Sequence, residues 1–271
     1  MSRSNATSEL PSVKPSPSSL VQQVQIRLQR LITLYGITGL VRICSAKFIG
    51  MVLWLTPSRR RARAALIEKD CAFDRQWGVN TSGRFVPEES NVIGPRWIHG
   101  LRYEGVDPDR LQQVLKELPI DPRDFTFIDM GSGKGRAILV ASRFPFRKVI
   151  GVEYSESLHQ IARKNIEIFR DPNIACTDVE AVWDDVLNFP IPAGPLLIFA
   201  NNPFNQSVMA GLIKRISESY QQAPRRIVVV YFHALLVDLW QAAEFLHTVK
   251  TSKAVSVFDS VDLNAGLKRA A

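Results

Sequence analysis

Hydrophobic positions between residues 125 and 260 follow two alternating patterns. Short, nearly continuous apolar runs predict buried strands at 125–129, 148–153, 179–183, 196–200 and 227–232. Segments whose apolar residues recur every three or four positions predict helices at 135–143, 157–170, 207–220 and 235–245. Residues 248–260 would supply the last strands. This alternation predicts an α/β fold with a mostly parallel sheet that is covered on both faces.

The front of the chain has a different pattern. Residues 1–19 are rich in Ser and Pro, which predicts a disordered leader, and residues 20–35 have the apolar spacing of an amphipathic helix. Residues 37–55 are long and apolar enough to span a bilayer, but Arg42 and Lys47 lie inside them. A helical cap on the main domain, a helix at a membrane surface and a transmembrane helix therefore all remain open for 37–55.

The middle of the chain connects these two parts. Residues 71–107 are loop-rich at first, and a helix is expected at 108–118 with Asp107 as its N-cap. We therefore expect a leader (1–19), a basic helical extension (20–70) and an α/β domain (71–271).

The charge of the chain is uneven. The net charge is +8, yet residues 1–70 hold 11 Lys and Arg against 3 Asp and Glu, whereas residues 71–271 hold 23 of each sign. A domain that binds nucleic acid usually carries its own positive surface, so the neutral main part argues against a nucleic-acid partner. The basic front end instead favours an anionic surface, most simply a membrane contacted through residues 20–63.

Cysteine and histidine usage excludes two classes of site. The three cysteines show no CxxC spacing and the four histidines no HxxxH pair, so neither a disulfide framework nor a metal site is expected. This usage fits a reducing compartment, and no secretory signal pattern precedes the domain. We expect a cytoplasmic protein, or one peripheral to the inner face of a membrane.

The clearest chemical motif is the glycine-rich stretch FIDMGSGKG at residues 127–135, placed between a predicted strand and a predicted helix. Such a turn lets a ligand approach the backbone, and the helix N-terminus behind it attracts negative groups. A Walker loop is excluded because Lys134 precedes Gly135 rather than Ser or Thr. The dinucleotide fingerprint fits poorly because Arg136 occupies a position that needs Gly or Ala.

The pattern that is present, an acidic residue followed by GxGxG, resembles motif I of class I S-adenosylmethionine-dependent methyltransferases. The resemblance implies a doubly wound, Rossmann-like sheet of seven strands with S-adenosylmethionine as the cofactor. It also implies a set of cofactor-binding residues in the turn, namely Asp129, Gly131, Ser132, Gly133 and Gly135.

Acidic residues also end the next two predicted strands. Glu153 ends the second strand, where a carboxylate can accept both ribose hydroxyls, although a helix-capping or surface carboxylate is the alternative. In the family an acid after the third strand contacts the adenine amino group. Asp185 fits that register best, with Asp184 as the alternative.

The fourth predicted strand leads into NNPF, which resembles the [DN]PP[FY] motif of amino-methylating members of the superfamily. The resemblance implies that Asn202, Pro203 and Phe204 orient the target nitrogen and shield the site. This sequence has one proline where the motif has two, so the register is open by one residue. A proline-terminated strand without a chemical role is the alternative.

Residues 125–204 are closest in pattern to protein-lysine methyltransferases that lack a SET domain. Those families close a preceding segment over the cofactor, which implies contacts from Tyr103, with Arg102, Trp97 and Asp74 as further candidates. His233 follows the fifth predicted strand, and we expect an ordinary surface or core histidine there, with a side chain that faces the pocket as the alternative.

Three function classes follow. The first is an N-methyltransferase acting on a protein lysine. The second uses a small amine or a nucleic-acid base as the acceptor. The third is a non-catalytic cofactor-binding protein at a membrane.

Overall fold

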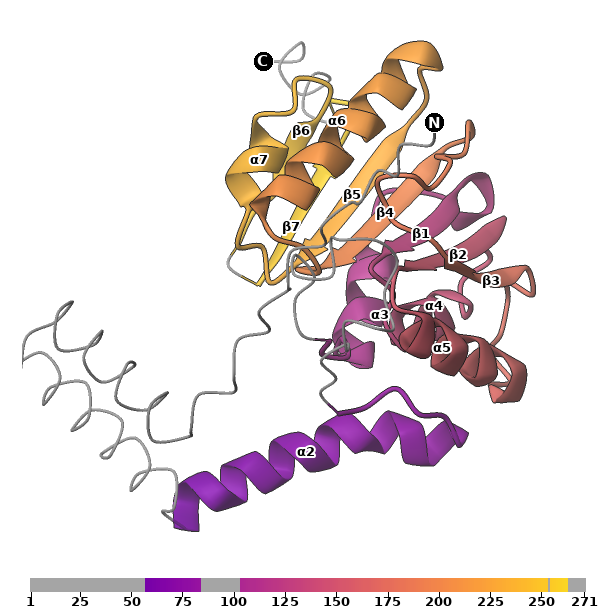
Figure 1. The fold of residues 1–271 in the computed structure, drawn as a ribbon, viewed down its shortest axis with the longest axis vertical. Coiled ribbons are helices and arrows are strands. Elements are labelled where there is room, and N and C mark those ends of the chain that lie inside the picture. Colours follow the sequence, from indigo (N-terminus) through magenta and orange to yellow (C-terminus); the bar gives the residue numbers. More distant parts are fainter. Residues whose placement is uncertain (1–56, 84–102, 253, 263–271) are drawn as a thin grey trace, which may run out of the picture. The chain divides into compact units, whose positions relative to one another are not determined.

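The computed structural model describes residues 57–83, 103–252 and 254–262 (Figure 1). The expectations for the leader, for the two stretches within 20–55 and for Trp97 and Arg102 lie outside these residues. The chain divides into two compact units, Met1–Ala64 and Ala65–Ala271, and the fold below belongs to the second.

A seven-stranded sheet forms the centre of this unit (Figure 1). Its spatial order is β3-β2-β1-β4-β5-β7-β6. The strands are β1 (Thr126–Met130), β2 (Lys148–Glu153), β3 (Val179–Trp183), β4 (Leu196–Asn201), β5 (Ile227–Phe232), β6 (His247–Lys250) and β7 (Val255–Asp259). The first five pair in parallel, and β7 runs antiparallel to both β5 and β6. The predicted seven-stranded, mostly parallel sheet is therefore confirmed.

Helices cover both faces of the sheet. They are α3 (Pro108–Glu117), α4 (Arg136–Ala141), α5 (Glu156–Ile168), α6 (Gln206–Gln222) and α7 (Val237–Gln241), with a short 3₁₀ helix η3 (Pro122–Asp124). One apolar cluster joins α3 and α4 to strand residues such as Phe127 and Phe199. A second joins α6 and α7 to Ile128 and Tyr231, so successive side chains of β1 serve opposite faces. Both faces are buried, which explains the continuous apolar runs of the strands.

The order of the strands creates a site for a ligand. The chain moves outward from β1 to β2 and β3, then returns to place β4 on the other side of β1. Ligands of open α/β sheets bind beyond the carboxyl ends of the strands at such a switch point. The glycine turn after β1 lies at this edge.

Helix α2 (Pro57–Trp77) extends further than the sequence predicted. Residues 71–77 were expected to be loop, but Phe73 and Trp77 lie one helical turn apart and both pack on Phe169, with ring centroids at 6.0 and 5.5 Å. The expected boundary between residues 70 and 71 therefore falls inside a helix. Among the helices that the structure describes, none is both long and apolar enough to cross a bilayer.

Arg136 connects α2 and the residues after it to the start of α4. Its guanidinium, in a residue 2 % exposed, donates to Asp70 Oδ1 at 2.7 Å, Thr81 Oγ1 at 2.7 Å and Val106 O at 3.3 Å. Asp74 accepts from the backbone of Thr81 at 2.8 Å and so shapes the same loop. One buried cation thus ties together three segments that are distant in sequence.

Replacement of this cation should destabilise the domain. Arg136→Ala leaves buried or half-buried oxygens without their partner, and we expect a loss of about 3–5 kcal/mol in the free energy of unfolding. Urea denaturation followed by circular dichroism measures it. The matched control is Arg123→Ala, because Arg123 forms an exposed ion pair with Asp121 and its loss should cost about 1 kcal/mol or less. Equal losses in the two variants would contradict the assigned role of Arg136.

Candidate functional site

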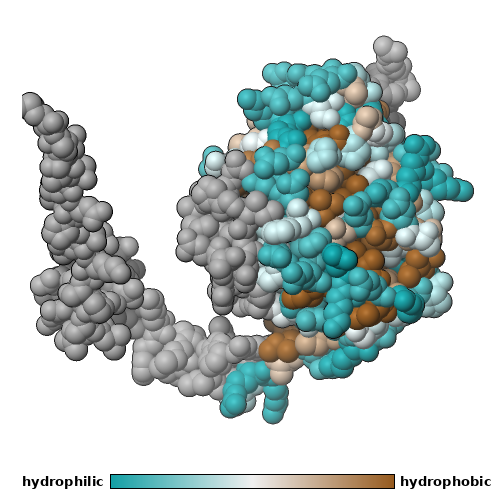
Figure 2. Space-filling model, turned by 45° about the vertical axis from the view of Figure 1, so that its right-hand side comes forward, coloured by the Kyte–Doolittle hydropathy of each residue, from teal (hydrophilic) through white to brown (hydrophobic). Residues whose placement is uncertain are grey.

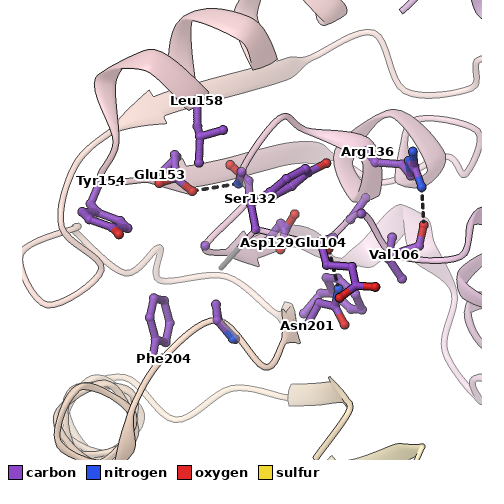
Figure 3. A pocket seen from close by; sticks show the side chains of 17 residues that line it. Glu104, Val106, Asp129, Ser132, Arg136, Glu153, Tyr154, Leu158, Asn201 and Phe204 are labelled. Carbon is purple, nitrogen blue, oxygen red and sulfur yellow. Dashed lines mark hydrogen bonds between the residues drawn. The ribbon is translucent and has the colours of Figure 1, made fainter. Parts of the chain in front are cut away.

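A cavity of about 600 Å³, measured with its open mouth, lies at the carboxyl ends of β1, β2 and β4 (Figure 3). Its lining comes from four segments, within residues 103–106, 129–137, 153–158 and 199–204. Side chains from these four segments converge on it, as the labelled residues in Figure 3 show.

The glycines of the turn are required by close packing. Gly131 and Gly133 have φ values of +87° and +54°, which disfavour residues with a Cβ. A Cβ at Gly131 would lie 2.6 Å from Pro203 Cβ, and one at Gly133 would collide with the Tyr103 ring. Gly135, also in the left-handed region, is the N-cap of α4 and lies outside the lining. The turn therefore sits directly between the segment after β4 and Tyr103.

Two buried carboxyl groups define the electrostatics of the cavity. Asp129 and Glu153 are each only 3 % exposed, and both line it. Glu153 accepts from the Gly133 backbone at 2.8 Å and from the Ser155 backbone at 2.9 Å. Burial nevertheless raises the pKa of Glu153 to about 7. Burial, followed by the neighbouring Glu153, raises the pKa of Asp129 well above its usual range.

Ser132 adds a hydroxyl that the protein leaves without a partner. Its side-chain oxygen is buried and forms no hydrogen bond within the described residues, and the residue lines the cavity beside Gly131 and Gly133. Buried polar atoms are rarely left unpaired unless a ligand or water satisfies them. The turn thus presents a hydroxyl suited to a polar ligand.

Tyr103 packs over the turn, and the cofactor contact that the resemblance implied for it stays a prediction. Its hydroxyl donates to Thr81 O at 2.6 Å, and the Lys134 ammonium lies 5.7 Å from its ring centroid. Lys134 itself donates to Ser82 O at 2.7 Å. Asp74, another candidate for this closure, is not in the lining, because its carboxylate caps the loop backbone.

The acids after β3 lie outside the cavity lining. Asp185 Oδ1 accepts from the Leu187 backbone at 2.9 Å, and Asp184 Oδ1 accepts from the Asp185 backbone at 2.7 Å. Tyr154 provides the lining on this side, and burial raises the pKa of its phenol to about 12. The role expected for Asp185 at the adenine amino group stays a prediction.

After β4, the asparagine whose side chain reaches the cavity is one residue earlier than the sequence motif predicted. Asn201, Pro203 and Phe204 line the cavity, whereas Asn202 does not. Asn202 has a φ of +45°, and its Oδ1 accepts from the Tyr231 hydroxyl at 2.8 Å. Because that oxygen already serves the Tyr231 hydroxyl, the amide at the cavity is that of Asn201. The sequence motif had left this register open by one residue.

Several lining residues were missed from the sequence. Leu158 and Phe199 belong to predicted elements but carry no motif, and Glu104 stands in a segment without periodicity. His233, for which the sequence left a place facing the pocket as the alternative, does not line the cavity, but its Nδ1 lies 3.0 Å from Asn201 Oδ1. Its position directly after the fifth strand was the only signal available.

Residues 101–174 match the sequence model of the family "Histone methylation protein DOT1". A 61-residue stretch is 39% identical to the Drosophila melanogaster protein "Histone-lysine N-methyltransferase, H3 lysine-79 specific". That stretch covers 22% of this chain and only 3% of the length of the fly protein.

Solved methyltransferase structures are also similar. TrmN from Thermus thermophilus is 16% identical with a TM-score of 0.42, over 58% of this chain and 49% of that chain. An RNA methyltransferase from Salinibacter ruber, in complex with S-adenosyl-L-homocysteine, is 18% identical with a TM-score of 0.36, over 62% and 92%. The T. thermophilus 16S rRNA N2 G1207 methyltransferase RsmC is 17% identical with a TM-score of 0.41, over 56% and 42%.

The matched segment 101–174 contains Tyr103, the glycine turn and Glu153. The glycine turn and Glu153 are residues on which the resemblance to class I methyltransferases was based, and a role for Tyr103 was implied by it. That resemblance is therefore confirmed, and within this segment the chain is similar to histone-lysine methyltransferases that lack a SET domain.

Proposed function

We propose that this protein transfers a methyl group from S-adenosylmethionine to the side-chain nitrogen of a protein lysine. The observation that carries the proposal is the pair of buried carboxyl groups, Asp129 and Glu153, beside a glycine turn. Two such buried groups at one cavity favour a ligand with positive charge and hydroxyl donors. A phosphate ester would meet like charge there, because the nearby Arg136 is already paired with Asp70.

The residues present fit S-adenosylmethionine, which supplies an electrophilic methyl group when bound. Asp129 would hold the ammonium of its amino-acid part, and Glu153 would accept the ribose hydroxyls. Ser132 offers the unpaired hydroxyl noted above.

The other end of the cavity suits an amine. The side-chain oxygen of Asn201 can accept a hydrogen bond from the nitrogen that receives the methyl group. The buried Phe204 ring excludes water beside this nitrogen. A lysine ammonium must lose its proton before it can attack a methyl group, and an apolar rim favours the neutral amine. Orientation and desolvation are thus the contributions of these residues.

The acceptor class rests on the similar proteins. The family description and the fly relative both name histones, and the neutral charge of residues 71–271 gives this part no general affinity for nucleic acid. We therefore propose a lysine of a histone or histone-like protein as the acceptor. A nucleic-acid base or a small amine is an alternative outcome of the labelling experiment below.

Cofactor affinity should depend on pH near neutrality. Glu153 binds hydroxyl donors best as a carboxylate, and its pKa of about 7 means that this form is lost as the pH falls. We expect the affinity for S-adenosylhomocysteine to weaken up to about tenfold per pH unit below that value. Isothermal titration calorimetry from about pH 6 to about pH 8 measures this.

The matched variant for this titration is Glu153→Gln. It keeps the size of the side chain but removes the titrating group, so binding should be about tenfold to a hundredfold weaker at pH 8 and less sensitive to pH. An unchanged pH dependence in the variant would contradict the role of Glu153.

Methyl transfer should depend on Asn201 more than on Asn202. Asn201→Ala removes the amide at the cavity, and we expect transfer to fall about a hundredfold while cofactor affinity stays nearly constant. Asn202→Gly tolerates the positive φ and loses only the Tyr231 hydrogen bond, so transfer should stay within a few-fold. Labelled methyl transfer into purified histones and cell extract, followed by mass spectrometry, measures both.

Two results would count against this assignment. Loss of transfer in Asn202→Gly with full activity in Asn201→Ala would restore the register expected from the sequence. Label found in nucleic acid or in small amines rather than in protein would replace the proposed acceptor.

We also propose that residues 20–63 bind an anionic membrane surface and keep the protein at its cytoplasmic side. Most of the excess positive charge lies in this part of the chain. In the described part of α2, Arg60 and Arg61 are exposed, as are Leu66 and Ile67 at 69% and 54%. By contrast, the face of the molecule drawn in Figure 2 is mostly polar, with apolar areas between.

The membrane proposal predicts cosedimentation with vesicles. The full chain should bind vesicles that contain phosphatidylserine, and binding should weaken as salt is raised, because the attraction is electrostatic. Deletion of residues 1–63 should abolish binding, and vesicles of phosphatidylcholine alone are the control. Equal binding by the truncated protein would contradict the proposal.

A further inference from the structure

We propose that His233 is a positioning residue that fixes the orientation of the Asn201 amide at the acceptor end of the cavity. The inference rests on the proposed function and deepens it. It starts from the register of the sheet, in which Asn201 at the end of β4 pairs with Phe232 at the end of β5. The residue after β5 is therefore brought beside the last residue of β4.

The contacts of Asn201 leave its amide a single orientation. Its Nδ2 donates to Glu104 O at 3.1 Å, and its Oδ1 lies 3.0 Å from His233 Nδ1. An amide oxygen only accepts, so His233 must donate through a protonated Nδ1. Rotation of the amide by 180° would place two acceptors against each other at Glu104 O, whichever tautomer His233 adopts.

This orientation leaves one acceptor position on the amide. The carbonyl oxygen of Asn201 has two lone pairs, and His233 uses one of them. The second lone pair remains for an N–H of the amine that receives the methyl group, since Asn201 lines the cavity. An Asn201 side chain held by two partners can direct the amine lone pair with little loss of freedom on binding.

The backbone at His233 supports a role beyond packing. His233 has a φ of +49°, a conformation that residues with a Cβ seldom adopt, and the neighbouring Asn202 has +45°. Within the described residues these are the non-glycine residues with positive φ, and both follow strands that end at the cavity edge. Strained residues of this kind concentrate at functional sites.

The surroundings of His233 exclude a simple core role. The residue is exposed, so its ring contributes little to the apolar clusters of the sheet. Its backbone is held from both sides, because its N–H donates to Ala254 O at 3.1 Å and its C=O accepts from the Leu235 N–H at 2.8 Å. The backbone anchors place the ring, and the ring in turn contacts Asn201.

Two substitutions separate the hydrogen bond from the backbone effect. His233→Gly adopts the positive φ without strain but removes the donor. His233→Asn also tolerates this conformation, and its amide N–H can replace the Nδ1–H. The matched control is His247→Asn, because His247 is an exposed histidine on β6 away from the cavity lining.

The experiment measures labelled methyl transfer, S-adenosylhomocysteine affinity and the urea midpoint for each variant of the full chain. We expect His233→Gly to lower kcat about tenfold to a hundredfold, with cofactor affinity and midpoint unchanged. We expect His233→Asn to restore kcat to within about threefold of the parent, and His247→Asn to change nothing.

The outcomes separate this inference from the proposed function. A parent protein that binds no cofactor and transfers no methyl group contradicts the proposed function itself. With an active parent, normal kcat in His233→Gly overturns the role of His233 alone. Equal loss in the Gly and Asn variants, or a fall in cofactor affinity or midpoint that accounts for the loss, also overturns it.

Discussion

The constraint on which this site depends is the burial of two carboxyl groups at neighbouring strand ends. Asp129 and Glu153 are almost fully removed from water, and the second is held by the backbone N–H groups of Gly133 and Ser155. Burial raises the pKa of both groups, and the neighbouring Glu153 raises the pKa of Asp129 further. A cationic ligand with hydroxyl groups relieves this cost. The two carboxyl groups therefore favour such a ligand in the cavity, whatever the methyl acceptor is.

The geometry around these acids is maintained from outside the sheet. Lys134 and Arg136, on either side of Gly135, reach the residues that follow α2, where they bind Ser82 O and Thr81 Oγ1. Those residues in turn accept the Tyr103 hydroxyl through Thr81 O, and Tyr103 packs on Gly133. The glycine turn is therefore enclosed by a loop that its own cations hold. A displacement of α2 would therefore also disturb the glycine turn, because these contacts link the two.

The sequence predicted the sheet better than the site. Three strands, β2, β3 and β5, match the expected bounds because polar residues or turns directly follow their apolar runs. The end of α2 was missed because Phe73 and Trp77 pack on Phe169, which is far away in sequence. Motif spacing predicted roles at the site for Asp185 and Asn202. The direction of their side chains instead depends on backbone turns that no sequence pattern encodes.

The choice between Asn201 and Asn202 shows how such a decision is made. Asn201 is the last residue of β4, whereas Asn202 already lies outside the strand. The left-handed φ of Asn202 turns the chain sharply after β4, and Tyr231 then binds the Asn202 amide oxygen. Pro203 and Phe204 can consequently pack against Gly131, where no Cβ stands in the way. Two features therefore leave the Asn201 amide facing the cavity: the hydrogen bond from Tyr231 on the neighbouring strand to Asn202, and the space at Gly131 in the turn.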